Sequence, residues 1–206
     1  MINKKKEIFV IIDGSSYLYR AFYALPHLKN NNGSHTGAIF GVTNMINKLL
    51  NDFSPKYVCA VFDARGKNFR HRIYKEYKSN RKSMPTELSE QVEPIFDFLK
   101  YMGIKIIQHP DVEADDVIAS LVNNHSTNIQ TFISSGDKDL AQLVNKNVSL
   151  MNSLDGKQLD QDGVKKKFGV APNQIKDYLT LVGDSSDNIP GVPKIGPKTA
   201  VNLLDK

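Results

Sequence analysis

The stretch "IFVIID" (residues 8–13) is a run of apolar, mostly β-branched residues that ends in an aspartate. It is too short for a helix and shows no polar alternation, which is typical of a strand buried on both faces. Similar runs occur at three further places, at residues 57–62, 104–107 and 129–134. Helix-like segments lie between and beside them, at about 15–24, 37–51, 86–102 and 113–123. This alternation predicts an α/β fold with a mainly parallel central sheet flanked by helices.

Length and composition describe an ordinary soluble globular protein. The chain has 206 residues, of which 40% are apolar and 24% charged, so we expect one main domain with at most a small appendage. No apolar run approaches the roughly 20 residues of a membrane span, and the N-terminal apolar segment is too short for a signal peptide. The single cysteine, Cys59, lies in an apolar run, where we expect a buried structural thiol and no disulfide framework. These features predict a cytoplasmic protein.

Acidic residues follow each of the four predicted strands. In open α/β sheets, ligands bind at the carboxyl ends of the strands, so side chains released there share one edge. One such Asp after one strand is explained more simply as a helix N-cap, because first-turn acids favour the helix dipole. Four coincidences favour a shared site. The candidates are Asp13, Asp63, Glu113, Asp115, Asp116, Asp137 and Asp139.

A further acidic cluster occurs in "LVGDSSDNIPG" (181–191). Asp184 and Asp187 lie three residues apart, so both face one direction if this turn is helical. With them the candidate ligands number nine carboxylates, too many to stay ionised in one cleft without counterions. All-oxygen ligation indicates hard ions such as Mg²⁺ or Mn²⁺ and not zinc, and the five histidines show no zinc-site spacing. A pair of such ions about 4 Å apart is the usual device for displacement at phosphorus.

Basic residues are segregated from these acids. The overall balance is modest, with 27 Lys and Arg against 22 Asp and Glu, but cations crowd into residues 65–82 and 165–169. The first segment combines charges for phosphates with an aromatic ring on which a base could stack, supplied by Arg70, Tyr77, Lys78 and Arg81. This pattern favours a polyanion bound beside the acidic site. The alternative is that residues 65–82 form a solvated helix face.

A third element is the glycine- and proline-rich stretch "NIPGVPKIGPKTAVNLL" (188–204). Its spacing predicts a tight hairpin between two helices, whose second N-terminus would present backbone amides to a phosphate. The candidate contacts are Gly191, Lys194, Gly196, Lys198 and Thr199. A nucleotide-binding P-loop is the competing interpretation, but Pro197 breaks its spacing and no predicted strand precedes it.

Five stretches resemble, in order, the 5′ nuclease domain at the N-terminus of bacterial DNA polymerase I, a member of the flap endonuclease family. They are "VIIDGSSYLYRAFYALP" (10–26), "AVFDARGKNFRHRIYKEYKSNRKSMP" (60–85), "VEADDVIASL" (112–121), "ISSGDKDLAQLV" (133–144) and "LVGDSSDNIPGVPKIGPKTA" (181–200). The resemblance implies a metal-dependent 5′-3′ exonuclease or flap endonuclease that acts in primer removal and repair. It implies a DNA substrate with a 5′ end, nick or flap, a polymerase domain or partner, a monomeric state and association with the bacterial nucleoid.

The resemblance also implies residue roles. It assigns a first metal region to Asp13, Asp63, Glu113, Asp115 and Asp116, and a second to Asp137, Asp139, Asp184 and Asp187, with Asp115 near both. The catalytic set is Lys78, Arg81, Asp115 and Asp116. Tyr77, Lys78 and Arg81 match the basic motif of a helical arch at about 65–85, and Arg70 matches a position just before it. The hairpin resembles a helix-hairpin-helix element, which in relatives holds a K⁺ ion on backbone carbonyls.

Two features depart from the family pattern. Lys194 stands where relatives often have glycine, which puts the tight turn and the K⁺ site in question, and a lysine there could contact a phosphate directly. The chain ends at Lys206, inside the second hairpin helix, so we expect either a fragment or a shortened chain. We divide it into a nuclease core at 1–160 and a helical, apparently truncated DNA-binding region at 161–206.

Two alternatives to an active nuclease stay open. The first is a catalytically impaired DNA-binding remnant of such a domain, and the presence of all nine acids weighs against it. The second is a ribonuclease or phosphatase built on the same kind of sheet edge. A small-molecule phosphatase needs neither an arch nor a hairpin, so these elements weigh against it.

Overall fold

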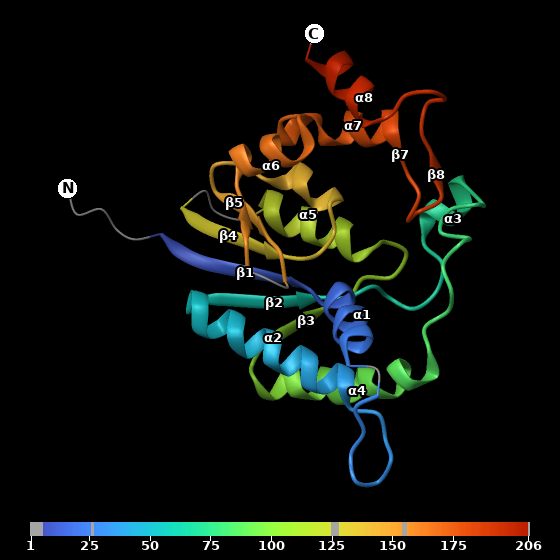
Figure 1. Cartoon of the computed structure of the whole chain (residues 1–206). Coiled ribbons are helices and arrows are strands. Elements are labelled where there is room, and N and C mark those ends of the chain that lie inside the picture. The colour runs from blue at the N-terminus through green and yellow to red at the C-terminus, as the bar shows by residue number, and fades with distance from the viewer. Residues whose placement is uncertain (1–5, 26, 125–127, 154–155, 206) are drawn as a thin grey trace, which may run out of the picture.

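A six-stranded sheet forms the centre of the computed structural model, which describes residues 6–25, 27–124, 128–153 and 156–205 (Figure 1). The strand order is β3-β2-β1-β4-β5-β6. The strands are β1 (Glu7–Asp13), β2 (Tyr57–Val61), β3 (Lys105–Ile107), β4 (Ile129–Ser134), β5 (Val148–Met151) and β6 (Gln158–Leu159). All neighbours pair in parallel except β5 and β6, which confirms the predicted mainly parallel sheet. The four predicted strands are present, and β5 and β6 were not predicted.

Helices cover both faces of the sheet (Figure 1). One face packs against α1 (Gly14–Ala24), α2 (Gly37–Phe53) and α4 (Thr86–Tyr101). The other carries α5 (Ala114–Asn124), α6 (Gln161–Phe168), α7 (Ile175–Val182) and α8 (Pro197–Leu204). Alternate residues of β1 divide between the two cores, because Val10 and Ile12 face the first and Ile11 faces the second. This division explains why the strand shows no polar alternation.

A buried side chain joins α4 to α2 on the first face of the sheet. Gln91 of α4 is 2% exposed, and its Oε1 accepts hydrogen bonds from the N–H groups of Ala38 (2.8 Å) and Ile39 (3.2 Å). These donors lie in the first turn of α2, where Thr36 supplies no side-chain cap. Gln91 therefore satisfies helix-end donors that would otherwise be buried without partners.

The segment after residue 160 is less regular than its sequence indicated. α6, α7 and α8 are helical as predicted, but β7 (Gly183–Asp184) and β8 (Ile189–Pro190) form an antiparallel hairpin. Asp184 and Asp187 were expected to face one direction if the turn between them is helical. The structure has a β-hairpin turn there, so the helical arrangement is wrong. Short helices complete the chain: α3 (Phe69–Ile73), η1 (Asp139–Leu143) and η2 (Pro172–Gln174).

Two further expectations concern the burial of Cys59 and membrane-spanning helices. Cys59 is 4% exposed, and burial raises the pKa of its thiol to about 12, so it is a buried structural residue as predicted. Among the described helices, none has the length and apolar character that a membrane span requires.

Candidate active site

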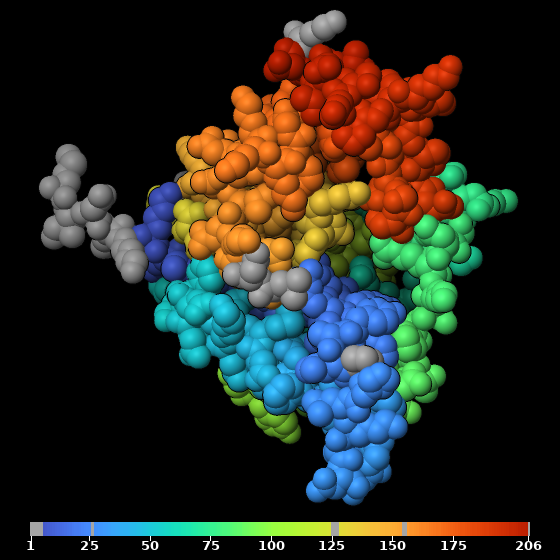
Figure 2. All heavy atoms as spheres, viewed as in Figure 1, coloured from blue at the N-terminus to red at the C-terminus, as the bar shows by residue number. Residues whose placement is uncertain are grey.

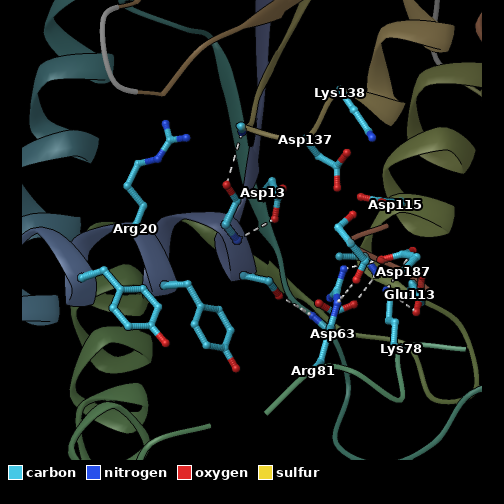
Figure 3. A pocket seen from close by; sticks show the side chains of 17 residues that line it. Asp13, Arg20, Asp63, Lys78, Arg81, Glu113, Asp115, Asp137, Lys138 and Asp187 are labelled. Atoms are coloured by element: carbon cyan, nitrogen blue, oxygen red, sulfur yellow. Dashed lines mark hydrogen bonds and ion pairs between the residues drawn. The ribbon is translucent and has the colours of Figure 1, made fainter. Parts of the chain in front are cut away.

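Six of the nine predicted carboxylates line one cavity at the carboxyl edge of the sheet. The cavity has a volume of about 620 Å³ and opens on the face shown in Figure 2, where the surface is hollowed beside the blue atoms of α1. Its acids come from the end of β1, from the residues after β2 and β4, from the start of α5 and from the β7–β8 hairpin (Figure 3). They are Asp13, Asp63, Glu113, Asp115, Asp137 and Asp187. Five of the predicted strand-end acids thus converge, and Asp187, from the separate acidic cluster 174 positions after Asp13, joins them.

The other three acids lie outside the lining of this cavity. Asp116 accepts two hydrogen bonds from Arg70, at 2.6 and 2.7 Å, and a third from the Glu113 N–H. Asp184 is 7% exposed and accepts from the Ser186 N–H and hydroxyl. Asp139 follows Asp137 in the stretch after β4, and its Oδ1 is buried without a hydrogen-bond partner in the described structure. An unpartnered buried carboxylate oxygen is costly and is consistent with a missing cationic ligand.

Local structure holds the lining acids in place. Asp13 caps α1, because its Oδ1 accepts from the Ser16 N–H at 2.9 Å. Its Oδ2 accepts from the hydroxyl of Ser135 at 2.5 Å, and the same hydroxyl accepts from the Asp137 N–H. Asp63 accepts from the Ala114 N–H at the first residue of α5. The strand ends and helix starts therefore fix the carboxylates as a group.

Burial and, after it, neighbouring negative charges raise the pKa of three of the predicted acids. Burial, followed by the charges of Asp137, Asp13 and Asp63, raises the pKa of Asp115 from 3.8 to about 8. Burial also raises the pKa of Asp13 to about 6, and burial with the charge of Asp137 raises the pKa of Asp139 to about 7. The acids are too close together and too dry to be ionised at once without positive charge.

The donor set fits hard divalent cations, although its geometry is not preassembled. Within the described ranges, no three His, Cys, Asp or Glu side chains are grouped closely enough to hold a metal ion. The lining acids nevertheless share one cavity, offer only oxygen donors and repel one another, and Asp139 has an orphaned oxygen. These features fit a cation site whose carboxylates come together on binding, because shifts in carboxylate rotamers would shorten the distances between their oxygens. Asp13, Asp63, Asp115 and Asp137 are the residues that would hold an ion here.

Basic side chains neutralise the acids at the outer rim (Figure 3). The Lys78 ammonium lies 2.7 Å from Glu113 Oε1 and 3.7 Å from Asp187 Oδ2, and Arg81 Nη2 lies 2.5 Å from Asp187 Oδ1. Burial opposes ionisation of Glu113, but the hydrogen bond and charge of Lys78 outweigh it and lower the pKa of Glu113. Within residues 65–85 the helix is the short α3, so the predicted helical arch stays a prediction. Lys78 and Arg81 occupy positions from which they could turn to a phosphate.

Tyr77 is buried in this arrangement. It is 5% exposed, and its hydroxyl contacts Glu113 Oε2 at 2.8 Å and Asp187 Oδ2 at 2.9 Å. One hydroxyl has one proton, so it donates fully to only one of these carboxylates at a time. The ring is not exposed for stacking here, and the base-stacking role stays a prediction.

The predicted duplex contacts lie apart from the carboxylates, in and after the loop at residues 191–196. None of Gly191, Lys194, Gly196, Lys198 and Thr199 lines the cavity, and all but the half-buried Gly191 are exposed. A Cβ at Gly191 would lie 2.4 Å from the Val182 backbone, so glycine is required there by close packing. The turn forms with lysine at 194, which takes the left-handed conformation at φ +68°. Their roles in DNA binding stay predictions.

Replacing Lys194 with glycine should stabilise the protein by about 0.5–1 kcal/mol. Left-handed backbone costs a residue with a Cβ roughly 1–2 kcal/mol, and glycine's greater freedom in the unfolded chain offsets part of that gain. The free energy of unfolding, measured in urea, tests this result. Lys198→Gly is the matched control and should destabilise, because Lys198 lies within α8. Equal destabilisation by both variants would show that no strain is stored at Lys194.

Several residues of the site were not singled out in the sequence. Ser135 joins Asp13 to Asp137, and Asn68 is 8% exposed and donates to Glu113 Oε1 at 2.7 Å. Lys138 lies 3.3 Å from Asp184, and Arg20 lines the cavity from α1. Ser135 and Lys138 lie in the same strand-end stretch as the predicted acids, which was the available signal. No comparable signal marked Asn68, because its bond to Glu113 spans 45 positions.

Comparison with known proteins places this site in a class. Residues 8–169 match the family model of the 5′-3′ exonuclease N-terminal resolvase-like domain, and residues 170–206 match that of the 5′-3′ exonuclease C-terminal SAM fold. The fold and the carboxylate edge therefore define a nuclease. The chain belongs to the 5′-3′ exonuclease family, which confirms the resemblance found in its sequence.

Individual proteins similar to this chain agree with the family assignment. DNA polymerase I of Pseudomonas aeruginosa is 49% identical over 196 residues, which are 95% of this chain and 22% of that protein. The 5′-3′ exonuclease of Buchnera aphidicola subsp. Baizongia pistaciae is 45% identical over 205 residues, 99% of this chain and 68% of that protein. The bacteriophage T5 flap endonuclease, solved as a complex with DNA and metal ions, aligns at a TM-score of 0.75 and 22% identity. That alignment covers 97% of this chain and 75% of the other, and it shows the shared fold.

Proposed function

We propose that this chain hydrolyses DNA phosphodiester bonds at 5′ ends, nicks or flaps, in primer removal and repair. The observation that carries the proposal is the cavity itself, where six carboxylates lie together beside Lys78 and Arg81. The family membership supports the reaction class, and the DNA and metal ions in the T5 complex support the ligands. The polymerase relatives support action beside a polymerase domain or partner. We place this action in the cytoplasm as part of the same proposal.

In this proposal the carboxylates bind metal ions, the loop at 191–196 binds the duplex, and two cations act on the substrate. Asp13, Asp63, Asp115 and Asp137 hold one region of hard cation binding, and Asp139, Asp184 and Asp187 contribute to a second. This division differs from the one that the resemblance implied, because Asp137 shares the cavity of the first region, whereas Glu113 is paired with Lys78 and Asp116 with Arg70. Bound Mg²⁺ or Mn²⁺ would supply Lewis-acid stabilisation of charge at phosphorus and would lower the pKa of a water. The loop at 191–196 grips the duplex, and a K⁺ ion on its backbone carbonyls belongs to the same proposal.

Lys78 and Arg81 act on the substrate directly. Each now contacts Asp187, and in the complex each exchanges this carboxylate for an oxygen of the scissile phosphate. Their positive charge then stabilises the charge that develops as water bonds to phosphorus and the bond to the 3′ oxygen breaks. The products are a 5′-phosphate and a 3′-hydroxyl. Asn68 and Tyr77 keep Glu113 in position by hydrogen bonding.

A cleavage assay tests the proposal and its alternative. A 5′-labelled flap or nicked duplex should be cut with millimolar Mg²⁺ and left intact with a chelator. Binding measured in chelator should weaken steeply with salt, because phosphate contacts release counterions. Binding without cleavage in Mg²⁺ and Mn²⁺ would instead support the catalytically impaired DNA-binding remnant.

Mg²⁺ should stabilise the protein more at pH 8 than at pH 5.5. The pKa values of Asp13, Asp139 and Asp115, at about 6, 7 and 8, lie above their ordinary value of 3.8. Between about pH 4 and 8 the folded protein therefore binds more protons than the unfolded chain, and metal-free stability falls as pH rises. Mg²⁺ binds the ionised acids, so its effect grows over the same window.

Melting temperature with and without Mg²⁺ measures this dependence, and sodium chloride at matched ionic strength is the control. An equal Mg²⁺-induced shift at both pH values would contradict ion binding by the acids with raised pKa.

A further inference from the structure

Two segments far apart in the chain meet beside the carboxylate cavity. One is the turn at residues 76–81, which carries Lys78 and Arg81, and the other is the hairpin formed by β7 and β8. Figure 1 shows β8 next to the segment that contains α3, and in Figure 2 red atoms of the hairpin touch green atoms of that segment. Charged and neutral hydrogen bonds cross this contact. A bound phosphate or metal ion would compete for the charged groups and not for the neutral ones.

The charged contacts have competing partners. Asp187 pairs with Arg81 at 2.5 Å and lies 3.7 Å from the Lys78 ammonium. In the proposed function the two cations turn to a phosphate and Asp187 to a metal ion. These pairs are therefore exchanged when substrate binds, and they cannot be what keeps the two segments together during the reaction.

The neutral contacts have no such competitors. The Asn188 side-chain amide donates to the Glu76 carbonyl at 2.8 Å and to the Ser79 hydroxyl at 3.0 Å. In the opposite direction, the Asn80 amide donates to the Ser185 carbonyl at 2.8 Å. The Lys78 N–H adds a backbone bond to the Asp187 carbonyl at 3.0 Å. These amides carry no charge for a phosphate or a metal ion to displace, so we expect their hydrogen bonds to persist in the complex.

Backbone conformation makes asparagine suitable at position 188. Asn188 has φ +57°, in the left-handed region that asparagine tolerates better than most residues with a Cβ. Lys78 also lies there, at φ +54°, which turns its N–H toward the hairpin while its ammonium reaches Glu113. The turn thus holds Lys78 in an unfavourable backbone conformation, and the hydrogen bonds from the hairpin stabilise that conformation.

We infer that Asn80 and Asn188 are positioning residues whose crossed side-chain amides latch the turn at 76–81 to the hairpin. The latch joins the duplex-gripping loop, which continues from β8, to the cations that face the carboxylates. A duplex held by that loop therefore sets the place of Lys78 and Arg81. The inference rests on the proposed function and deepens it. If the latch positions Lys78 and Arg81, it governs the rate of DNA cleavage and not the affinity for the duplex.

Three variants test the latch. Asn188→Gly removes the amide and keeps the left-handed backbone available, so it separates the lost hydrogen bonds from backbone strain. Asn188→Asp keeps the shape and turns the donor into an acceptor that faces the Glu76 carbonyl. Asn80→Ala removes the opposite amide. The matched control is Asn31→Gly, an exposed position in the loop between α1 and α2.

Two measurements separate a positioning role from a structural one. The first is single-turnover cleavage of a flap substrate in saturating Mg²⁺, compared with the dissociation constant for the same DNA in chelator. The second needs neither DNA nor metal: the rate of trypsin cleavage within residues 75–82, followed by mass spectrometry, reports opening of the turn. Melting temperature verifies that each variant is folded.

Asn188→Gly and Asn188→Asp should each lower the cleavage rate about 10-fold, leave the dissociation constant within about twofold, and raise trypsin cleavage about 10-fold. Adding Asn80→Ala to Asn188→Gly should lower the rate by much less than the product of the single effects, because both act on one latch. The control should match wild type in all three measurements.

Unchanged trypsin cleavage in both Asn188 variants would overturn the latch. Faster trypsin cleavage with a normal rate of DNA cleavage would overturn its positioning role, as would a loss confined to DNA affinity. A wild-type chain that does not cut DNA would overturn the proposed function, whereas the trypsin comparison would still decide whether the amides join the two segments.

Discussion

Asp115→Asn should lower the single-turnover rate of DNA cleavage by about 10³-fold or more. Asp115 stands at the first turn of α5 and faces the charges of Asp13, Asp63 and Asp137. An amide has nearly the same shape but supplies no negative charge, so the cavity loses attraction for a hard cation. Rate at saturating DNA, measured over a range of Mg²⁺ concentrations, reports both the loss and any rescue by metal.

The same variant should fold at least as stably as wild type without metal. The pKa of Asp115 is raised to about 8, so near neutral pH its carboxyl is mostly protonated and resembles an amide. Above pH 8 the variant should be the more stable of the two, because it avoids a repelled charge. Its Mg²⁺-induced rise in melting temperature should be smaller. Asp162→Asn, at an exposed acid in the first turn of α6, is the matched control. Wild-type cleavage by Asp115→Asn would exclude the metal region proposed here.

Lys78→Met should lower the cleavage rate about 10²-fold, through loss of a positive charge beside the scissile phosphate. The methionine keeps much of the apolar stem, so packing changes less than with alanine. Without metal the variant should also be less stable, by about 1–3 kcal/mol, because Glu113 loses a charged partner at 2.7 Å. Glu113 keeps hydrogen bonds from Asn68 and Tyr77, which limits the loss.

Lys75→Met is the control for the loss of one charge in the same segment, since Lys75 is exposed and lies outside the lining of the cavity. It should change DNA affinity slightly and leave the rate at saturating DNA unchanged. Equal loss of rate in both lysine variants would show that Lys78 contributes only general positive charge. Urea unfolding of the two variants separates the stability effect from the catalytic one.

The sequence alone determined the framework of this protein. Strands β1 to β4 and helices α1, α2, α4 and α5 lie within two residues of their predicted ranges. Hydrophobic periodicity is local, and a strand buried on both faces is apolar throughout. Strand β5 was missed because "VSLM" is short and lies among polar residues such as Asn147 and Asn152. Its place in the sheet depends on pairing with β4, which no local pattern shows.

For the site, the sequence determined that acids collect at one sheet edge, because parallel strands end on the same side. Only the tertiary structure decided which acids share a cavity and which are already paired. Asp116 was predicted as a metal ligand but is engaged by Arg70, and Tyr77 was matched to an arch motif but is buried between two carboxylates. These pairings join side chains 36 to 110 positions apart. Such contacts depend on how α3, the turn at 76–81 and the β7–β8 hairpin pack beside the start of α5, and residue spacing along the chain does not encode that geometry.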